Sequence, residues 1–168
     1  MTVALFSRGK ASRAAAAACA VTLGLVALTA CDKPTPVATV TVGSHSEVSE
    51  ATKGCYDEDG ISKKDINTCL NKETGETLTV HPGERVRIGV DPKIAEDGWV
   101  VVTGPEPVMN DESTETYRSF DGEKLFETRN QMGQTEIRDE VTLAVVQLGE
   151  KDTAPPVGMW HFKLKLEP

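Results

Sequence analysis

Residues 160–167 read WHFKLKLE, and this stretch indicates the fold most directly. Large apolar side chains alternate with polar ones from Trp160 to Leu166, which is the period of a β-strand with one face on a core and the other in water. Residues 141–148 (VTLAVVQL) predict a long strand, and residues 99–102 (WVVV) predict a central strand covered on both faces.

Turn signals divide the preceding sequence into further short strands. Two strand pairs are predicted, each divided by a turn: residues 77–80 with 85–90 about Pro82-Gly83, and residues 117–120 with 124–126 about Asp121-Gly122. Many short strands and a single short helix indicate an all-β protein. The expected fold is an immunoglobulin-like antiparallel β-sandwich of two sheets.

The N-terminal segment has the layout of a secretory signal. Residues 1–13 are basic, and residues 14–30 are apolar but shorter than the about 18 residues that indicate a membrane-spanning helix. The sequence Leu28-Thr29-Ala30-Cys31 resembles the lipobox of bacterial lipoprotein precursors. The resemblance implies removal of residues 1–30 and attachment of acyl chains, such as palmitate, at Cys31. An ordinary signal peptide with a chance cysteine is the alternative.

The predicted lipobox fixes the expected organisation of the chain. A lipidated Cys31 begins a tether over residues 31–50, rich in Pro, Thr and Ser, with room for a first edge strand over residues 37–42. The β-sandwich is expected over residues 51–168. The expected location is the outer face of the cytoplasmic membrane, where two acyl chains anchor a protein stably.

The charge balance excludes one class of partner. The chain has 26 acids and 18 bases, and removal of residues 1–30 takes away three bases, so the mature part carries 15 − 26 = −11. Proteins that bind nucleic acid neutralise phosphates with basic patches. We therefore expect no nucleic-acid partner.

Cys55 and Cys69 are expected to form a disulfide, because the protein is exported and no other unmodified cysteine is left in its mature part. A short helix is predicted beside this bond, with Ser62 as N-cap and with Ile66, Cys69 and Leu70 on one face. Metal ligation by the two thiols is the alternative, but no second pair of ligands accompanies them.

Two sets of residues are candidates for metal ligands. Residues 57–65, with Asp57, Asp59 and Asp65, resemble the later half of an EF-hand loop, although a residue is missing and the closing Glu is replaced by Ile66. This favours a solvated acidic turn over a calcium site. The second set, His81, Met159 and His161, lacks the thiolate of a blue-copper centre and leaves only a surface copper site as an alternative.

No catalytic arrangement is predicted. The sequence holds no Gly-x-Ser-x-Gly motif, and Ser44-His45-Ser46 falls in or beside the tether. Four acids between Glu106 and Glu115 indicate a solvated loop rather than the paired carboxylates of a glycosidase. We therefore expect a protein that is not an enzyme and that takes no cofactor.

Several segments together resemble an actinobacterial family of predicted lipoproteins with an unassigned immunoglobulin-like domain. They are the lipobox, Gly54-Cys55-Tyr56 with Cys69, residues 86–91 with Gly98-Trp99, and Trp160-His161-Phe162. The resemblance covers most of the mature chain. It implies no activity.

The remaining indications of function lie in loops, which carry most binding residues. Val108 and Met109 lie among acids in one segment, and Pro155 and Pro156 lie in another, so each segment offers apolar contacts within a polar rim. The predicted function is a membrane-anchored, non-enzymatic binding or accessory module that recognises an envelope protein. A carrier of a small ligand or of calcium or copper is the alternative.

Overall fold

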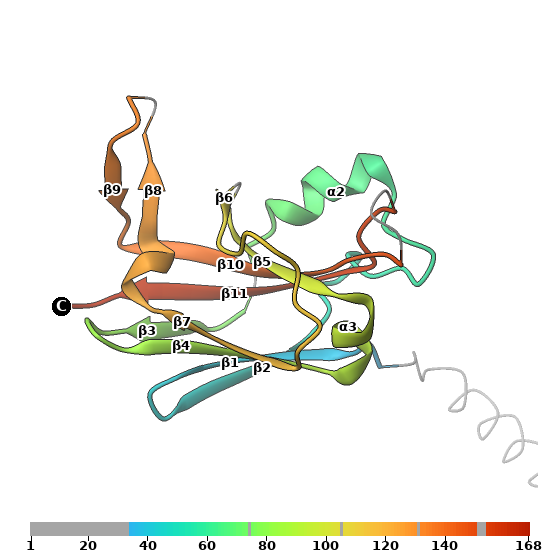
Figure 1. Ribbon diagram of the computed structural model, residues 1–168, viewed down its shortest axis with the longest axis horizontal. Coiled ribbons are helices and arrows are strands. Elements are labelled where there is room, and N and C mark those ends of the chain that lie inside the picture. Colours follow the sequence, from blue (N-terminus) through green and yellow to red (C-terminus); the bar gives the residue numbers. More distant parts are fainter. Residues whose placement is uncertain (1–33, 74, 105, 131, 151–153) are drawn as a thin grey trace, which may run out of the picture. The chain divides into compact units, whose positions relative to one another are not determined.

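Alternating apolar side chains distribute most of the chain between two β-sheets that pack face to face (Figure 1). The computed structural model describes residues 34–168 except 74, 105, 131 and 151–153. Residues 35–168 form one compact unit. The predicted signal peptide and Cys31 lie outside the described residues.

The first sheet has the strand order β2-β1-β4-β7, and all its neighbouring strands are antiparallel. Its strands are β1 (Val37–Val42), β2 (His45–Glu50), β4 (Arg85–Val90) and β7 (Tyr117–Asp121). Ala38, Val40 and Val42 are buried, and the residues between them lie on the outer face. This alternation places one face of the sheet on the core.

The second sheet has the strand order β3-β11-β10-β5-β6. Its strands are β3 (Thr77–Val80), β5 (Trp99–Thr103), β6 (Glu106–Pro107), β10 (Glu140–Gln147) and β11 (Gly158–Leu166). All neighbours are antiparallel except β3 and β11, which run parallel. The long strands expected near residues 99, 141 and 160 are thus confirmed.

Large side chains fill the space between the sheets. Trp160, Phe162 and Leu164 of β11 are fully buried there with Trp99 of β5 and Ile88 of β4. Each buried side chain of this kind contributes about 1.5–3 kcal/mol to folding. Both indole groups are hydrogen-bonded, because Trp160 Nε1 donates to the Pro36 carbonyl (2.9 Å) and Trp99 Nε1 donates to the Glu115 carbonyl (2.8 Å).

A second apolar cluster covers the outer face of the second sheet. Cys55, Ile61 and Cys69 pack on Val146 of β10 and Met159 of β11. They belong to the segment 51–73, which includes helix α2 (Lys63–Leu70). The disulfide between Cys55 and Cys69 closes this segment (Cα–Cα 5.7 Å) and confirms the predicted pairing.

The segment 51–73 corrects the prediction for the last strand. The alternation of residues 160–167 predicts that His161 faces water, but His161 is fully buried on the outer face of β11. Met159 on the same face is also buried. The alternation of residues placed the side chains of this strand on the correct faces. It did not indicate that a distant segment covers the outer one.

Three short elements complete the structure. They are helix α3 (Pro92–Asp97), the 3-10 helix η1 (Glu123–Phe126) and a hairpin of β8 (Glu127–Arg129) and β9 (Thr135–Ile137). The hairpin projects away from the two sheets (Figure 1). The Asn130 side chain holds its turn by accepting from the Met132 and Gln134 amides.

The sandwich begins earlier than the expected boundary at residue 51. Residues 37–50 form β1 and β2, and β1 lies between two strands rather than at an edge. Thr35 and Pro36 are also held, because Thr35 Oγ1 accepts from the Ala51 amide (2.9 Å) and Pro36 accepts from Trp160. The part of the predicted tether that follows Pro34 therefore belongs to the folded unit.

Neither of the two predicted strand pairs forms. The turn at Pro82-Gly83 is present, but β3 and β4 belong to different sheets, so the turn carries the chain from one sheet to the other. Residues 124–126 form the helix η1 instead of a strand. A helical turn buries both Leu125 and Phe126, whereas a strand would turn one of them outward.

Gly122 explains why the chain bends at this point. Its amide donates to the Glu84 carbonyl (3.0 Å), and a Cβ atom would lie 2.6 Å from that oxygen and 2.7 Å from Val80 Cγ1. Real side chains do not approach so closely, so β7 ends against the β3–β4 turn only because residue 122 is glycine.

The disulfide is expected to stabilise the domain through the unfolded chain. The cysteines are 14 positions apart, and closing a loop of that size contributes about 3 kcal/mol. We predict that the pair of substitutions Cys55→Ser and Cys69→Ser lowers the free energy of unfolding by about this amount in urea titrations. An unchanged urea midpoint would show that the bond is dispensable.

Candidate functional site

Three connecting segments meet at the end of the sandwich where β1 begins. They comprise residues 51–62, 91–98 and the described residues of 148–157, and we call this region the loop end. Main-chain hydrogen bonds join them: the Asp57 amide donates to Val157, the Ile61 amide donates to Pro156, and the Leu148 amide donates to Gly98. These hydrogen bonds hold the three loops in fixed positions relative to one another.

An open cavity of about 440 Å³ lies between the three loops. Its charged lining residues are Glu58, Asp59, Lys93, Asp97 and Glu150, and Pro155 adds an apolar wall. Four carboxylates face one cation, so the cavity is negatively charged. Gly60 permits the close packing of its rim, because a Cβ at that position would lie 2.5 Å from Pro155 Cγ.

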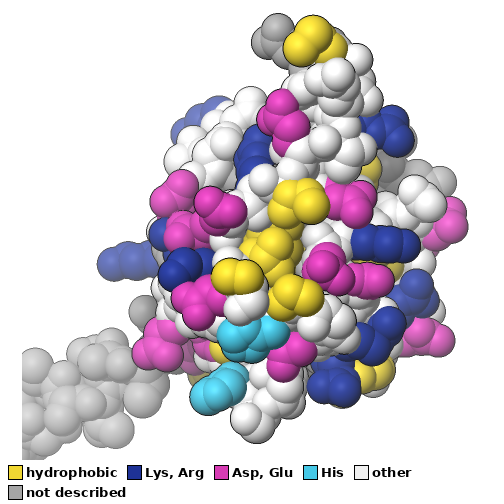
Figure 2. Space-filling view, turned by 90° about the vertical axis from the view of Figure 1, so that its left-hand side faces the viewer, with side chains coloured by type: hydrophobic (Ala, Val, Ile, Leu, Met, Phe, Trp, Pro, Cys, Tyr) yellow, Lys and Arg dark blue, Asp and Glu magenta, His cyan; other side chains and the backbone are white. Residues whose placement is uncertain are grey.

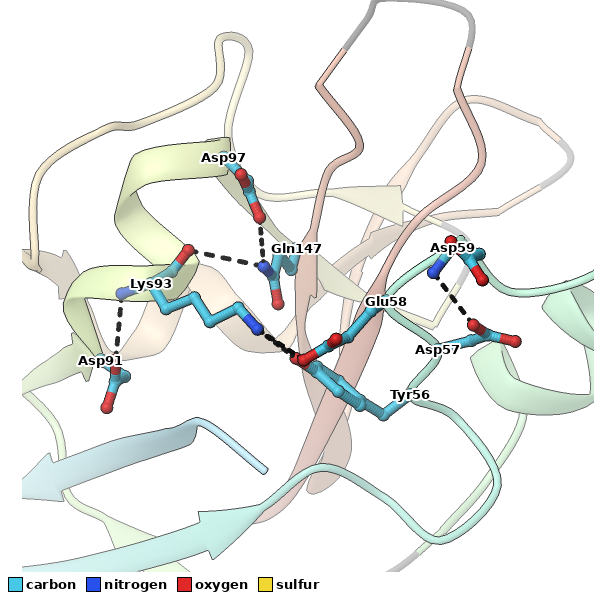
Figure 3. Close-up of polar contacts among 8 residues, drawn as sticks. All are labelled: Tyr56, Asp57, Glu58, Asp59, Asp91, Lys93, Asp97 and Gln147. Atoms are coloured by element: carbon cyan, nitrogen blue, oxygen red, sulfur yellow. Dashed lines mark hydrogen bonds and ion pairs between the residues drawn. The ribbon is translucent and has the colours of Figure 1, made fainter. Parts of the chain in front are cut away.

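Lys93 links helix α3 to the first loop (Figure 3). Its Nζ donates to Glu58 Oε1 (2.8 Å) and to the Tyr56 hydroxyl (3.2 Å). The hydrogen bond to Glu58, and then that to Tyr56, raise the pKa of Lys93 above its ordinary value, so the side chain stays cationic. The pair is exposed, and such pairs contribute little to stability but can fix the position of a loop.

A buried glutamine lies beneath helix α3. Gln147, the last residue of β10, has no exposed surface, and its Nε2 donates to Asp97 Oδ2 (2.6 Å) and to the Lys93 carbonyl (3.5 Å) (Figure 3). The Asp91 side chain caps the helix by accepting from the Lys93 amide (3.0 Å). Both ends of α3 are thereby positioned against the cavity.

The residues predicted as calcium ligands divide into two local groups. Asp57 Oδ1 accepts from the Asp59 amide (3.0 Å), and Asp65 Oδ2 accepts from the Ser62 hydroxyl (2.5 Å). Among the described residues, no three His, Cys, Asp or Glu side chains are arranged to hold a metal ion. Asp57 and Asp59 instead form a turn at the rim of the cavity.

The structure separates the residues predicted as copper ligands. Met159 and His161 are buried on the outer face of β11, and the Thr52 hydroxyl pairs with His161 Nδ1 (2.7 Å). His81 is exposed beside the Glu167 carbonyl, six residues beyond His161 along an extended segment, so roughly 20 Å lies between the two histidines. These three residues therefore do not form one site.

The end of the domain opposite the loop end is shown in Figure 2, where the histidine side chains lie close to acidic ones. A hollow of about 610 Å³ is lined there by His45, His81 and four glutamates. Another hollow, of about 210 Å³, lies on the second sheet between helix α2 and strand β8. Neither contains the loop residues that the sequence indicated as a binding surface.

Only two of the four predicted binding residues lie at the loop end. Pro155 lines the cavity, and Pro156 accepts the Ile61 hydrogen bond beside it. Met109 is buried in the core and Val108 packs against it, so these two residues do not offer an exposed apolar contact. Their neighbours in the sequence are acidic, but the Val108 amide donates to the Val101 carbonyl of β5 and so holds this segment beside the core.

Sequence reasoning missed Tyr56, Lys93 and Gln147. A local signal existed for Lys93, since Asp91 followed by Pro92 is the start of a helix with an N-cap and proline in its first turn. No signal existed for the contacts of these residues, because Lys93 lies 37 positions from Tyr56 and 54 from Gln147.

Comparisons with protein-family models, with curated proteins and with solved structures each found no match. Within the described part of the chain, no helix is both long and apolar enough to cross a membrane.

His161 is expected to make the stability of the domain depend on pH. Burial lowers its pKa from 6.5 to about 4, against the opposing effect of the Cys69 carbonyl. Between these two values the unfolded chain binds a proton that the folded chain does not. We predict that stability is lost by about 3 kcal/mol as the pH falls from 7 to 4 through this group alone.

Chemical denaturation of the variant His161→Gln at several pH values measures this contribution. The glutamine does not titrate, so the variant loses that part of the pH dependence. The variant His81→Gln, at an exposed position, keeps it. An equal pH dependence in His161→Gln and the unmodified protein would contradict the assignment.

The hydrogen bond between Asp97 and Gln147 is expected to stabilise α3. The substitution Asp97→Ala leaves a buried amide without its closest partner, which costs about 1–3 kcal/mol of the free energy of unfolding. Glu96→Ala, at the exposed neighbouring position, is the matched control and should change it by less than about 0.5 kcal/mol. Equal effects of the two substitutions in denaturation curves would contradict this role for Asp97.

Proposed function

We propose that the mature protein is a lipid-anchored, non-enzymatic accessory module of the cell envelope. In this proposal residues 1–30 are a signal peptide, Cys31 carries acyl chains, and an immunoglobulin-like sandwich lies on the outer face of the cytoplasmic membrane. Its loop end recognises an envelope protein. The observation that carries the proposal is the convergence of three loops on one open, charged cavity.

The character of the cavity favours a protein surface as ligand. Sites for small molecules are usually enclosed and mostly apolar. This cavity is open, and charged side chains line it together with the apolar Ala154, Pro155 and Val157. Interfaces between proteins combine a few apolar contacts with a polar rim, and that combination is found here.

The proposed lipid anchor favours binding to membrane proteins. Two acyl chains hold a protein on a membrane stably, and confinement near the membrane raises the effective concentration of the loop end toward membrane proteins. A net charge of −11 in the mature part suits a partner whose exposed surface is basic. The proposed partner is therefore a membrane protein of the envelope with a basic surface outside the bilayer.

Crosslinking in living cells tests this function. A photoreactive residue in place of Asp59, at the loop end, is expected to yield one major adduct with an envelope protein. The same residue in place of Met132, at the exposed hairpin tip, is the control and should not yield it. The adduct at position 59 should disappear when Cys31→Ser releases the protein from the membrane.

Two results would contradict the proposal. One is an adduct at position 59 that survives Cys31→Ser undiminished. The other is no adduct at position 59, combined with a rise in melting temperature of the purified protein on addition of calcium or copper, which would favour the carrier function.

A further inference from the structure

The folded unit begins close to the proposed lipid. Thr35 and Pro36 are held by hydrogen bonds to Ala51 and Trp160, so only the chain between Cys31 and Thr35 is left as a tether. Four residue steps span at most about 14 Å when fully extended. Surfaces of the sandwich that lie far from the start of β1 therefore cannot rest on the bilayer.

The two sheets differ in what covers their outer faces. The segment 51–73 packs on the outer face of the second sheet, which also lies about 10 Å behind the first. No described segment covers the outer face of the first sheet (Figure 1). Strand β1 belongs to this sheet, and its first residue, Val37, lies on the uncovered face.

We call this uncovered surface the open sheet face. The residues that form it are Val37, Thr39 and Thr41 of β1, Ser46, Val48 and Glu50 of β2, Arg85, Arg87 and Gly89 of β4, and Tyr117, Ser119 and Asp121 of β7.

One row of paired residues crosses the whole open sheet face. Val48 pairs with Thr39, Thr39 with Gly89, and Gly89 with Tyr117. Val48 and Tyr117, at the two ends of the row, are 63% and 51% exposed and are two of the four large apolar side chains exposed in the described part of the chain. Gly89 adds no side chain and Thr39 adds a short one, so the row is flat, with the apolar surfaces of Val48 and Tyr117 at its two ends.

Charge separates the open sheet face from the loop end. The open sheet face carries Arg85 and Arg87 against Glu50 and Asp121, so its charges balance. The cavity at the loop end carries four carboxylates against Lys93. An anionic bilayer repels the loop end at the short distance that the tether imposes, and it does not repel the open sheet face.

We propose that the open sheet face rests on the bilayer surface, with Tyr117 and Val48 at the level of the lipid headgroups. This inference rests on the proposed anchoring at Cys31. Tyrosine is enriched at membrane interfaces because its ring is apolar and its hydroxyl is polar, and arginine pairs with lipid phosphates. The strands then run along the membrane, and the loop end points sideways toward neighbouring membrane proteins.

Fluorescence quenching by lipids tests this orientation on the full lipidated protein. In the mature chain Cys31 is acylated and Cys55 is bonded to Cys69, so an introduced cysteine is the only free thiol. A fluorophore is attached through Val48→Cys, Asp59→Cys or Met132→Cys in vesicles of phosphatidylethanolamine and phosphatidylglycerol that contain a headgroup nitroxide lipid. These positions report the open sheet face, the loop end and the hairpin tip.

The expected result is quenching at position 48 that is several-fold stronger than at position 132, with position 59 between them. Adding Tyr117→Ser and Arg87→Glu should reduce the quenching at position 48. Adding Ile137→Ser, which replaces an exposed apolar residue on the hairpin, should leave it unchanged.

Stronger quenching at position 59 or 132 than at position 48, or equal quenching at all three, would overturn the proposed orientation. The intact mass and the flotation of each sample with vesicles are measured in parallel. Protein without the acyl mass that does not float would instead contradict the anchoring and hence the proposed function.

Discussion

Burial of strand β11 on both faces is the constraint on which the rest of the structure depends. One face places Trp160, Phe162 and Leu164 between the sheets, and the other places Met159 and His161 beneath the disulfide-closed segment. The same strand is hydrogen-bonded to β10 on one side and to β3 on the other. It also holds the start of the sandwich, because the Trp160 indole donates to Pro36 and the Met159 carbonyl accepts from the Thr52 amide.

This arrangement makes the two sides of the sandwich unequal. The segment 51–73 packs on the second sheet, and its first part places Tyr56, Glu58 and Asp59 at the loop end. The first sheet is left bare on its outer face, next to the point where the chain enters the fold. The charged loop end and the flat, neutral open sheet face thus both follow from the packing of segment 51–73 on one sheet only. Both proposals on function use this asymmetry.

The sequence predicted the disulfide and the strands near residues 77, 85, 99, 117, 141 and 160, but not the partners of these strands. The Pro82-Gly83 turn is equally compatible with a hairpin and with a crossing between sheets, and the choice depends on β3 pairing with β11, more than 80 positions away. For His161 the period of two assigned the face, yet the environment of that face depends on residues 52 and 69. The adjacent residues Leu125 and Phe126 are compatible with a strand or with a 3-10 turn. Only the turn buries both side chains, and the sequence does not show that both are buried. At the site, Pro155 was predicted because loops carry most binding residues, and Asp59 was considered only as a calcium ligand in a segment that resembles an EF-hand loop. Lys93 and Gln147 were missed because they act through contacts between distant segments.

Amide hydrogen exchange of the oxidised domain tests the central role of β11 most directly. The amides of Trp160 to Leu164 should exchange only through global unfolding and should be the slowest in the chain, slower than those of the edge strand β2. Reduction of the disulfide should accelerate exchange in residues 55–70 before it affects the first sheet. Exchange in β11 as fast as in β2 would contradict the account, because a strand buried on both faces and bonded on both edges cannot open alone.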